Sequence, residues 1–219
     1  MIANELISND LVPLRTSDTG ELALETMHEF FVQHLPIVND RELLGIVSES
    51  DILDNDAGEA VGSYRLSLPH AVVRDGDHLY EVMRLVAQYD LTAVPVVDAD
   101  GNYQGLVTSA DLLNYYARTS PFVETGSIII LEVQRRDYSL AEIARIAESE
   151  DAIILSSFLD SIADGSLLQV TIKVNHEHIS GITSTFERFG YEVKATFNEG
   201  FALDTLRERY DALISYLNV

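Results

Sequence analysis

The chain has 219 residues, of which 47% are apolar and 23% charged, so it is long enough to build one or two domains around a real core. Its net charge of −22 argues against nucleic acid or an anionic membrane surface as a partner, and the absence of cysteine excludes disulfides and zinc–thiolate sites. With no long apolar run and no N-terminal secretion signal, we expect a cytoplasmic protein.

The first sixty residues predict the order strand, helix, strand, strand, helix. An extended segment over residues 11–15 leads to Asp18, which can cap a helix whose apolar positions recur every three or four residues. A short apolar strand follows at residues 35–38, and after a turn a second strand ends in the sequence GIVSESD at residues 45–51. Asp51 closes this motif and opens the next helix.

The same order returns about 60 residues later, with a matching apolar strand at residues 94–97 and the sequence GLVTSAD at residues 105–111. The register between the copies slips by one residue in the turn at residues 98–102, where an insertion is tolerated. Matching residues on both sides of a slipped turn indicate an internal duplication. We therefore expect two units, about 1–62 and 63–120.

The repeated motif carries a hydroxyl residue, Ser48 or Thr108, three residues before Asp51 or Asp111. A hydroxyl near a helix start suits a phosphate, because the unpaired N–H groups there favour anions. A carboxylate only accepts hydrogen bonds, so it suits the vicinal diol of a ribose. The pair therefore indicates a nucleoside phosphate, although the same two residues can also form a simple helix cap.

An arginine stands at the end of the first strand in both units, as Arg15 and Arg74. Few cations occur in this half of the chain, so a repeated arginine suggests a clamp for phosphate. The alternative is an exposed strand-end residue that pairs with a nearby aspartate.

The second half begins after the break at Thr119-Ser120-Pro121 and spans residues 126–219. It predicts strands at 127–133, 152–159, 167–174 and 191–197 and helices at 140–147 and 179–189. The order β-α-β-β-α-β is that of a ferredoxin-like fold. A last segment, 203–217, has its apolar residues on one face of an extra helix. The whole chain is therefore expected to be a mixed α/β (α+β) protein.

The two repeated motifs resemble a tandem pair of cystathionine-β-synthase (CBS) domains, the Bateman module, over residues 1–120. The second half resembles an ACT domain, a small regulatory module, but it reads Asp137-Tyr138-Ser139 where that family usually has Asp-Pro-Gly, whose glycine admits an amino-acid ligand. The domain order is similar to that of the bacterial acetoin-utilisation regulatory proteins. The resemblance implies a homodimer and an adenosyl ligand in one or both units, with Asp51 and Asp111 at the ribose, Ser48 and Thr108 at phosphate, and the backbone of Leu35 and Val94 at the base.

The sequence thus predicts a non-enzymatic sensor that binds AMP, ADP, ATP, NAD or S-adenosylmethionine and relays a conformational change. A protein target, which the sequence does not identify, is a further candidate partner. It shows no nucleophile motif, no phosphate loop and no cluster of metal ligands, so neither catalysis nor a tightly bound metal is expected. Two other hypotheses stay open: a structural adaptor without ligand, and a Mg²⁺-responsive module that uses the acidic surface.

Overall fold

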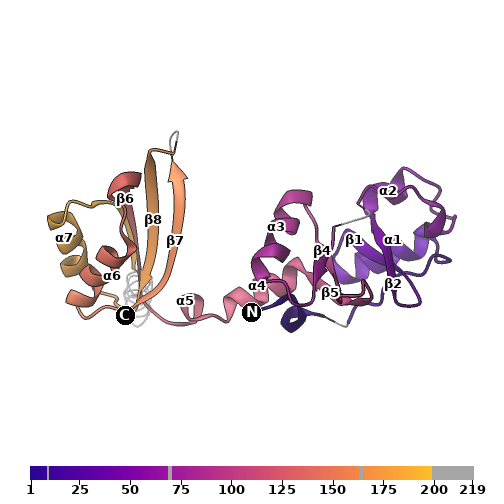
Figure 1. Cartoon of the computed structure of the whole chain (residues 1–219), viewed down its shortest axis with the longest axis horizontal. Coiled ribbons are helices and arrows are strands. Elements are labelled where there is room, and N and C mark those ends of the chain that lie inside the picture. Colours follow the sequence, from indigo (N-terminus) through magenta and orange to yellow (C-terminus); the bar gives the residue numbers. More distant parts are fainter. Residues whose placement is uncertain (9, 69–70, 163–164, 199–219) are drawn as a thin grey trace, which may run out of the picture. The chain divides into compact units, whose positions relative to one another are not determined.

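The computed structural model describes residues 1–8, 10–68, 71–162 and 165–198. The chain divides into two compact units, Met1–Ala117 and Arg118–Val219 (Figure 1). None of the helices in the described ranges is long and apolar enough to cross a membrane.

The first unit contains the expected duplication. Each half has a helix, two antiparallel strands and a second helix, preceded by a short entry segment. The first half consists of η1 (Ala3–Leu6), α1 (Gly20–Phe30), β1 (His34–Asn39), β2 (Glu42–Ser48) and α2 (Glu49–Leu53). The second half consists of η2 (Val61–Ser63), β3 (Val73–Arg74), α3 (Leu79–Tyr89), β4 (Ala93–Val97), β5 (Tyr103–Thr108) and α4 (Ser109–Ala117).

The leading strand of each half is much shorter than the sequence predicted. Residues 11–15 contribute only the isolated bridge between Leu14 and Ile37, and β3 has two residues, paired with β4. Asp18 also differs from expectation, because its carboxylate accepts the Arg15 N–H at 2.7 Å and Thr19 is the residue that caps α1. The aspartate therefore closes the turn before the helix.

The strand pairs repeat the same register. β1 pairs antiparallel with β2 and β4 with β5, and both pairs have their irregularity at the equivalent place, after Ile37 and after Val96. Every residue of β4 is buried, as is every residue of β1 before its last. Because the middle strands are buried on both faces, they read as continuous apolar runs in the sequence.

The two halves exchange their entry segments. Residues 2–8 lie against the second half, where Ile2 pairs with His78 and the Ser8 N–H donates to the Leu106 carbonyl at 2.9 Å. The linker before β3 lies against the first half, where Leu68 pairs with Ile46. Each of the two hydrophobic cores of this unit therefore contains residues from both halves.

The second unit has the ferredoxin-like βαββαβ fold that the sequence predicted. Its elements are α5 (Ser120–Val123), β6 (Ser127–Gln134), η3 (Arg135–Asp137), α6 (Leu140–Ser149), β7 (Ile154–Ile162), β8 (Leu167–Val174), α7 (Ser180–Arg188) and β9 (Glu192–Asn198). The strands form one antiparallel sheet in the order β7-β8-β6-β9, with α6 and α7 on one face (Figure 1). The extra helix expected at 203–217 lies outside the described residues.

Gly20 occupies a space that admits no side chain, which gives a test of how tightly the first half is packed. A Cβ at Gly20 would meet the Tyr64 hydroxyl, Ile52 Cγ2 at 2.8 Å and the Ala57 backbone at 2.9 Å. We expect Gly20→Ala to lower the free energy of unfolding by about 1–3 kcal/mol, as overpacked cores do. Urea denaturation followed by far-UV circular dichroism measures the change.

The matched control is Gly76→Ala, since a Cβ at Gly76 meets no atom within 4 Å. This substitution should stay within about 0.5 kcal/mol of the wild type. Equal denaturation midpoints for the two variants would contradict the tight packing at Gly20.

Candidate functional site

The two repeated motifs form the same reciprocal helix cap. In the first half, the Asp51 carboxylate accepts the Ser48 N–H at 3.0 Å and the Ser48 hydroxyl accepts the Asp51 N–H at 3.1 Å. In the second half, the equivalent bonds between Thr108 and Asp111 measure 2.8 and 3.1 Å. The alternative interpretation of the motif, a helix cap, is therefore realised in both halves.

The hydroxyls of the motif are already engaged within the protein. The Thr108 hydroxyl also donates to Asp111 Oδ2 at 2.6 Å, and the Ser48 hydroxyl lies 2.9 Å from that of Ser50. A phosphate at either place would have to share a hydroxyl that holds a helix end. In each motif the carboxylate is therefore more available to a ligand than the hydroxyl.

The two carboxylates differ in what remains for a ligand. Asp51 is only 7% exposed, and it also accepts the Ser67 N–H at 3.3 Å and the Ser67 hydroxyl at 3.2 Å. Asp111 is half-buried, and both hydrogen bonds to its carboxylate end on Oδ2, so that Oδ1 has no hydrogen-bond partner among the described residues. Of the two motif carboxylates, that of Asp111 is therefore the one with an oxygen that is close to the surface and unengaged.

Strand pairing brings the expected base-contacting residues to the same end as the motifs. Leu35 pairs with Val47 and Val94 pairs with Val107. Leu35 and Val94 therefore each lie one position along the strand from the residue that pairs with the motif's hydroxyl residue. The side chains of Leu35 and Val94 are fully buried in the two cores. Only their backbone could reach a ligand, as the resemblance implied.

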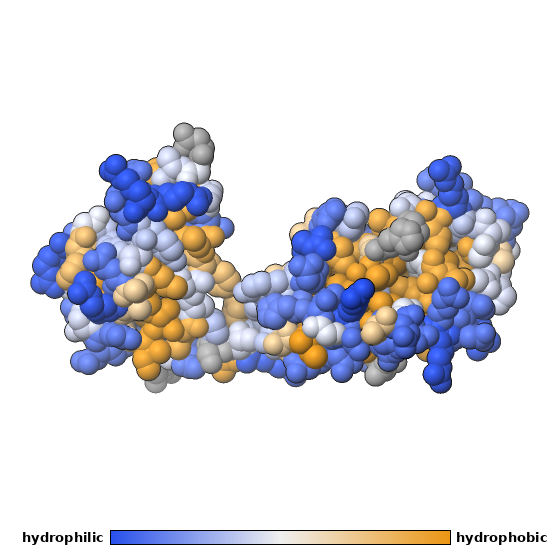
Figure 2. Space-filling view, in the orientation of Figure 1, coloured by the Kyte–Doolittle hydropathy of each residue, from blue (hydrophilic) through white to orange (hydrophobic). Residues whose placement is uncertain are grey.

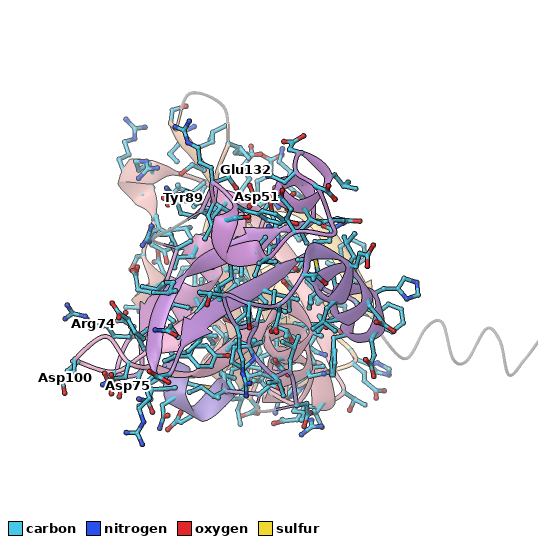
Figure 3. The ribbon with its side chains drawn as sticks, turned by 90° about the vertical axis from the view of Figure 1, so that its right-hand side faces the viewer. Asp51, Arg74, Asp75, Tyr89, Asp100 and Glu132 are labelled. Carbon is cyan, nitrogen blue, oxygen red and sulfur yellow. The ribbon has the colours of Figure 1, made fainter. Side chains whose placement is uncertain are left out.

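Arg15 and Arg74 lie at the other end of the strands. Arg74 pairs with Val97 at the end of β4, whereas Thr108 pairs with Ala93 at its start, about 13 Å away at the usual rise of a strand. Figure 3 shows Arg74 well apart from Asp51. Both arginines are exposed, and the structure describes no salt bridge for either in the ranges it covers.

This placement separates the repeated arginines from the repeated motifs. Arg15 lines a surface hollow of about 580 Å³ together with the turn at Asn39 and Asp40, on the side away from Ser48. The structure therefore does not bring the predicted phosphate clamp together with the predicted ribose site.

A hydrogen-bonded seam joins the two halves beside the motifs, and the sequence did not indicate it. The Thr92 hydroxyl accepts the Gln33 N–H at 2.7 Å, and the Thr92 N–H donates to His34 Nδ1 at 3.2 Å. Because Nδ1 accepts a backbone N–H, the imidazole is neutral and carries its proton on Nε2. No sequence signal marked the seam, since His34 and Thr92 occupy places that differ between the copies.

Burial controls the protonation of this histidine. His34 is 8% exposed, and burial lowers the pKa of its imidazole below the usual 6.5, although the charges of Asp90 and Asp51 offset part of the shift. Protonation would also remove the acceptor for the Thr92 N–H. The hydrogen bonds of the seam therefore require the neutral imidazole of His34.

A second hollow, of about 350 Å³, opens beside the seam between the end of α1 and the start of α2. Gln33, Glu49 and Thr92 line its polar side, and Phe31, which is 92% exposed and has a φ of 54°, stands at its rim. Figure 2 shows apolar surface gathered over the part of this unit that contains β1 and β4. In the described part of the chain, no three His, Asp or Glu side chains lie together as a metal ion would require.

Comparison with known families gives a match over the whole duplicated unit. The sequence profile of the CBS domain matches the chain twice, over residues 3–58 and over residues 61–118. Together the two matches cover more than half of the 219 residues.

Two curated proteins are similar over the same region. The inosine-5'-monophosphate dehydrogenase of Korarchaeum cryptofilum is 28% identical over 120 residues, which is 55% of this chain and 25% of that enzyme. An uncharacterized protein of Methanocaldococcus jannaschii is 30% identical over 106 residues, which is 48% of this chain and 38% of that protein. The chain thus spans well under half of the length of either relative.

Solved structures with similar geometry include a CBS domain pair/ACT domain protein from Thermotoga maritima, with a TM-score of 0.48 and 23% identity over 53% of this chain and 96% of that one. CBSX2 in complex with AMP gives a TM-score of 0.46 and 28% identity, again over 53% of this chain and 96% of the other.

The neutral His34 ring predicts a loss of stability on acidification. Because the folded pKa lies below the unfolded value, the unfolded chain binds more protons once the pH falls below about 6.5, and unfolding is favoured. We expect the melting temperature of the wild type to fall more steeply between about pH 7.5 and 6 than that of His34→Gln. Thermal melts across this range measure the two slopes.

The control is His28→Gln, which alters an exposed histidine on α1 and should keep the wild-type slope. Identical slopes for His34→Gln and the wild type would show that the seam tolerates the protonated ring.

Proposed function

Because the chain belongs to the CBS-domain family, with one copy at residues 3–58 and another at 61–118, we propose that it is a non-enzymatic regulatory protein that binds an adenosine-containing nucleotide in this pair. CBS pairs are regulatory nucleotide-sensing modules, and the duplicated unit has the complete architecture of one.

The observation that carries the proposal is the open oxygen of Asp111. Asp111 Oδ2 is held by Thr108, so the carboxylate has a fixed orientation, and Oδ1 remains to accept hydrogen bonds. A vicinal diol offers two O–H donors to such an acceptor, and a ribose is the diol that an adenosyl ligand presents. A charged, half-buried acceptor held by its own helix makes a preorganised binding group.

Electrostatics narrows the choice of ligand. The chain carries a net charge of −22, and Arg15 and Arg74 lie at the far end of the strands from the motifs. The two repeated arginines therefore do not offset the repulsion that a triphosphate would meet, and this repulsion is smaller for a ligand with fewer negative charges. S-adenosylmethionine, NAD and AMP fit this condition better than ADP or ATP.

In this proposal the hydrogen bonds at Thr92 couple ligand binding in one half to the position of the other half. The Gln33 N–H and the Thr92 N–H bond across the two copies next to the motif helices. A ligand that fits one relative angle of the halves better than another would shift the population toward that angle. In this proposal the ferredoxin-like unit passes the change to a target.

We also propose that two copies of the chain associate through the helices of the CBS pair. Leu53 on α2 and Leu113 on α4 occupy equivalent positions, and both are 71% exposed. Phe30 and Tyr89 form a second equivalent pair of exposed side chains at the ends of α1 and α3. The same apolar side chains in both halves suit an interface made of identical surfaces.

The structural adaptor remains the second candidate function. It is favoured by one observation, namely that the hydroxyls of Ser48 and Thr108 are both committed to helix caps. An adaptor would show no increase in melting temperature with any nucleotide, whereas a sensor is stabilised by ligand at concentrations well above its Kd.

The ligand proposal predicts a specific effect of Asp111→Asn. The amide can keep an oxygen toward the Thr108 N–H, but its NH₂ group then replaces the free Oδ1 acceptor by a donor. We expect the Kd for AMP to rise at least about tenfold, since a hydrogen bond to a charged group contributes about 1.5–3 kcal/mol. Isothermal titration calorimetry measures the change.

Arg74→Ala is the control, because this arginine lies away from the motif, and it should leave the Kd for AMP within about twofold. If Asp111→Asn binds AMP as tightly as the wild type, the ribose is not held by this carboxylate.

The dimer proposal predicts that charge at the equivalent leucines separates the copies. The double variant Leu53→Glu/Leu113→Glu should elute as a monomer in size-exclusion chromatography with light scattering, because carboxylates resist burial in an apolar contact. Leu140→Glu, at an exposed position on α6 of the other unit, should leave the mass unchanged. An unaltered dimer in the double variant would place the contact elsewhere.

A further inference from the structure

The exchanged entry segments occupy equivalent places in the two halves. Leu68 pairs antiparallel with Ile46, and Ser8 pairs antiparallel with Leu106. Both members of these pairs are 60 residues apart, which is the register of the repeated motif itself. The residue before each bridge, Ser67 or Ile7, therefore stands at the same position relative to its neighbouring motif.

The two residues at this position differ in chemistry. Ser67 donates its N–H and its hydroxyl to the Asp51 carboxylate at 3.3 and 3.2 Å. Ile7 has no side-chain donor and packs partly buried against the core that contains Val107 and Leu112. The entry segment thus supplies hydrogen-bond donors to the carboxylate of the first half, and in the described part of the chain it supplies none to that of the second half.

The hydrogen-bonding capacity of the two carboxylates can be compared directly. A carboxylate offers about four lone-pair positions. Asp51 uses three of them, for the Ser48 N–H and for the two donors of Ser67. Asp111 uses two, both on Oδ2 and both for Thr108, so that its remaining oxygen can accept the two hydroxyls of a diol.

The exposure of the two carboxylates also favours Asp111 as the open position. Asp51 is 7% exposed and Asp111 is half-buried, so a ligand reaches the second carboxylate more easily. A diol at Asp51 would first have to displace the hydroxyl of Ser67 and then uncover the carboxylate.

We propose that Ser67 occupies the ribose position of the first half, so that the chain binds one adenosyl ligand at Asp111 and keeps a second, closed site at Asp51. This inference rests on the proposed function, because it assigns that function to one of two homologous positions. Residue 67 decides how many ligands bind, and residue 7 is its counterpart in the open site.

Calorimetric titration of the full chain with AMP tests the inference through the number of ligands bound. The wild type should bind one AMP per chain and Ser67→Ala should bind two. The double variant Ser67→Ala/Asp111→Asn should return to one, now held by Asp51. Far-UV circular dichroism verifies that each variant is folded.

The reciprocal experiment closes the open site. Ile7→Ser places a hydroxyl beside Asp111 where Ser67 stands beside Asp51, and Ile7→Ala removes the same bulk without adding a donor. We expect Ile7→Ser to weaken AMP binding at least tenfold relative to Ile7→Ala. This pair also decides the question if Ser67→Ala does not fold.

The outcomes separate this inference from the proposed function. Three results would overturn the role of residue 67 while the protein remains a nucleotide binder. They are two AMP molecules bound by the wild type, one bound by Ser67→Ala, or equal AMP affinities of Ile7→Ser and Ile7→Ala. Binding to Ser67→Ala alone would support the closed site and refute the one at Asp111. Absence of binding in the wild type and in Ser67→Ala would overturn both.

Discussion

The bond between a carboxylate and the strand-end N–H three residues before it is the constraint on which the candidate site depends. In both halves it fixes where the strand stops and where the helix begins. It also engages one carboxylate oxygen of Asp51 and of Asp111 in capping the helix. The neighbouring residues then determine whether the other oxygen has a hydrogen-bond partner. The helix cap and the proposed ribose contact therefore use the same side chain, which explains why the motif alone could be interpreted either way.

The surroundings of the second oxygen come from the other half of the duplication. The linker that leads into β3 lies along β2, and the N-terminal segment lies along β5. This exchange buries each entry segment in a core shared by both halves, so the two copies form one unit. It also places a polar residue, Ser67, beside the Asp51 carboxylate, whereas an apolar residue, Ile7, stands at the equivalent position of the second half.

Much of the fold could be predicted from the sequence because it depends on local patterns. Helical spacing, the apolar runs of β1 and β4, and the β-α-β-β-α-β order of the second unit are all visible in single segments. The hydroxyl cap was also visible, since its two residues are neighbours in the chain. The separation of Arg74 from the motif was not, because the sequence places Arg74 at the end of its strand but does not show at which end of the neighbouring strands it lies. Ser67 and the bond between His34 and Thr92 depend on tertiary contacts across 16 and 58 residues, and no periodic pattern reports such contacts.

The exchange of entry segments also bears on how the two copies can diverge during evolution. The entry segment that lies along each motif strand belongs to the opposite repeat, so under the proposed role of residue 67 a mutation in one copy would change the binding properties of the other. Selection could therefore silence or restore a ligand position through substitutions in the leading segment, without touching the motif that also caps the helix. A pair of repeats arranged in this way can alter its stoichiometry while its folding determinants stay unchanged.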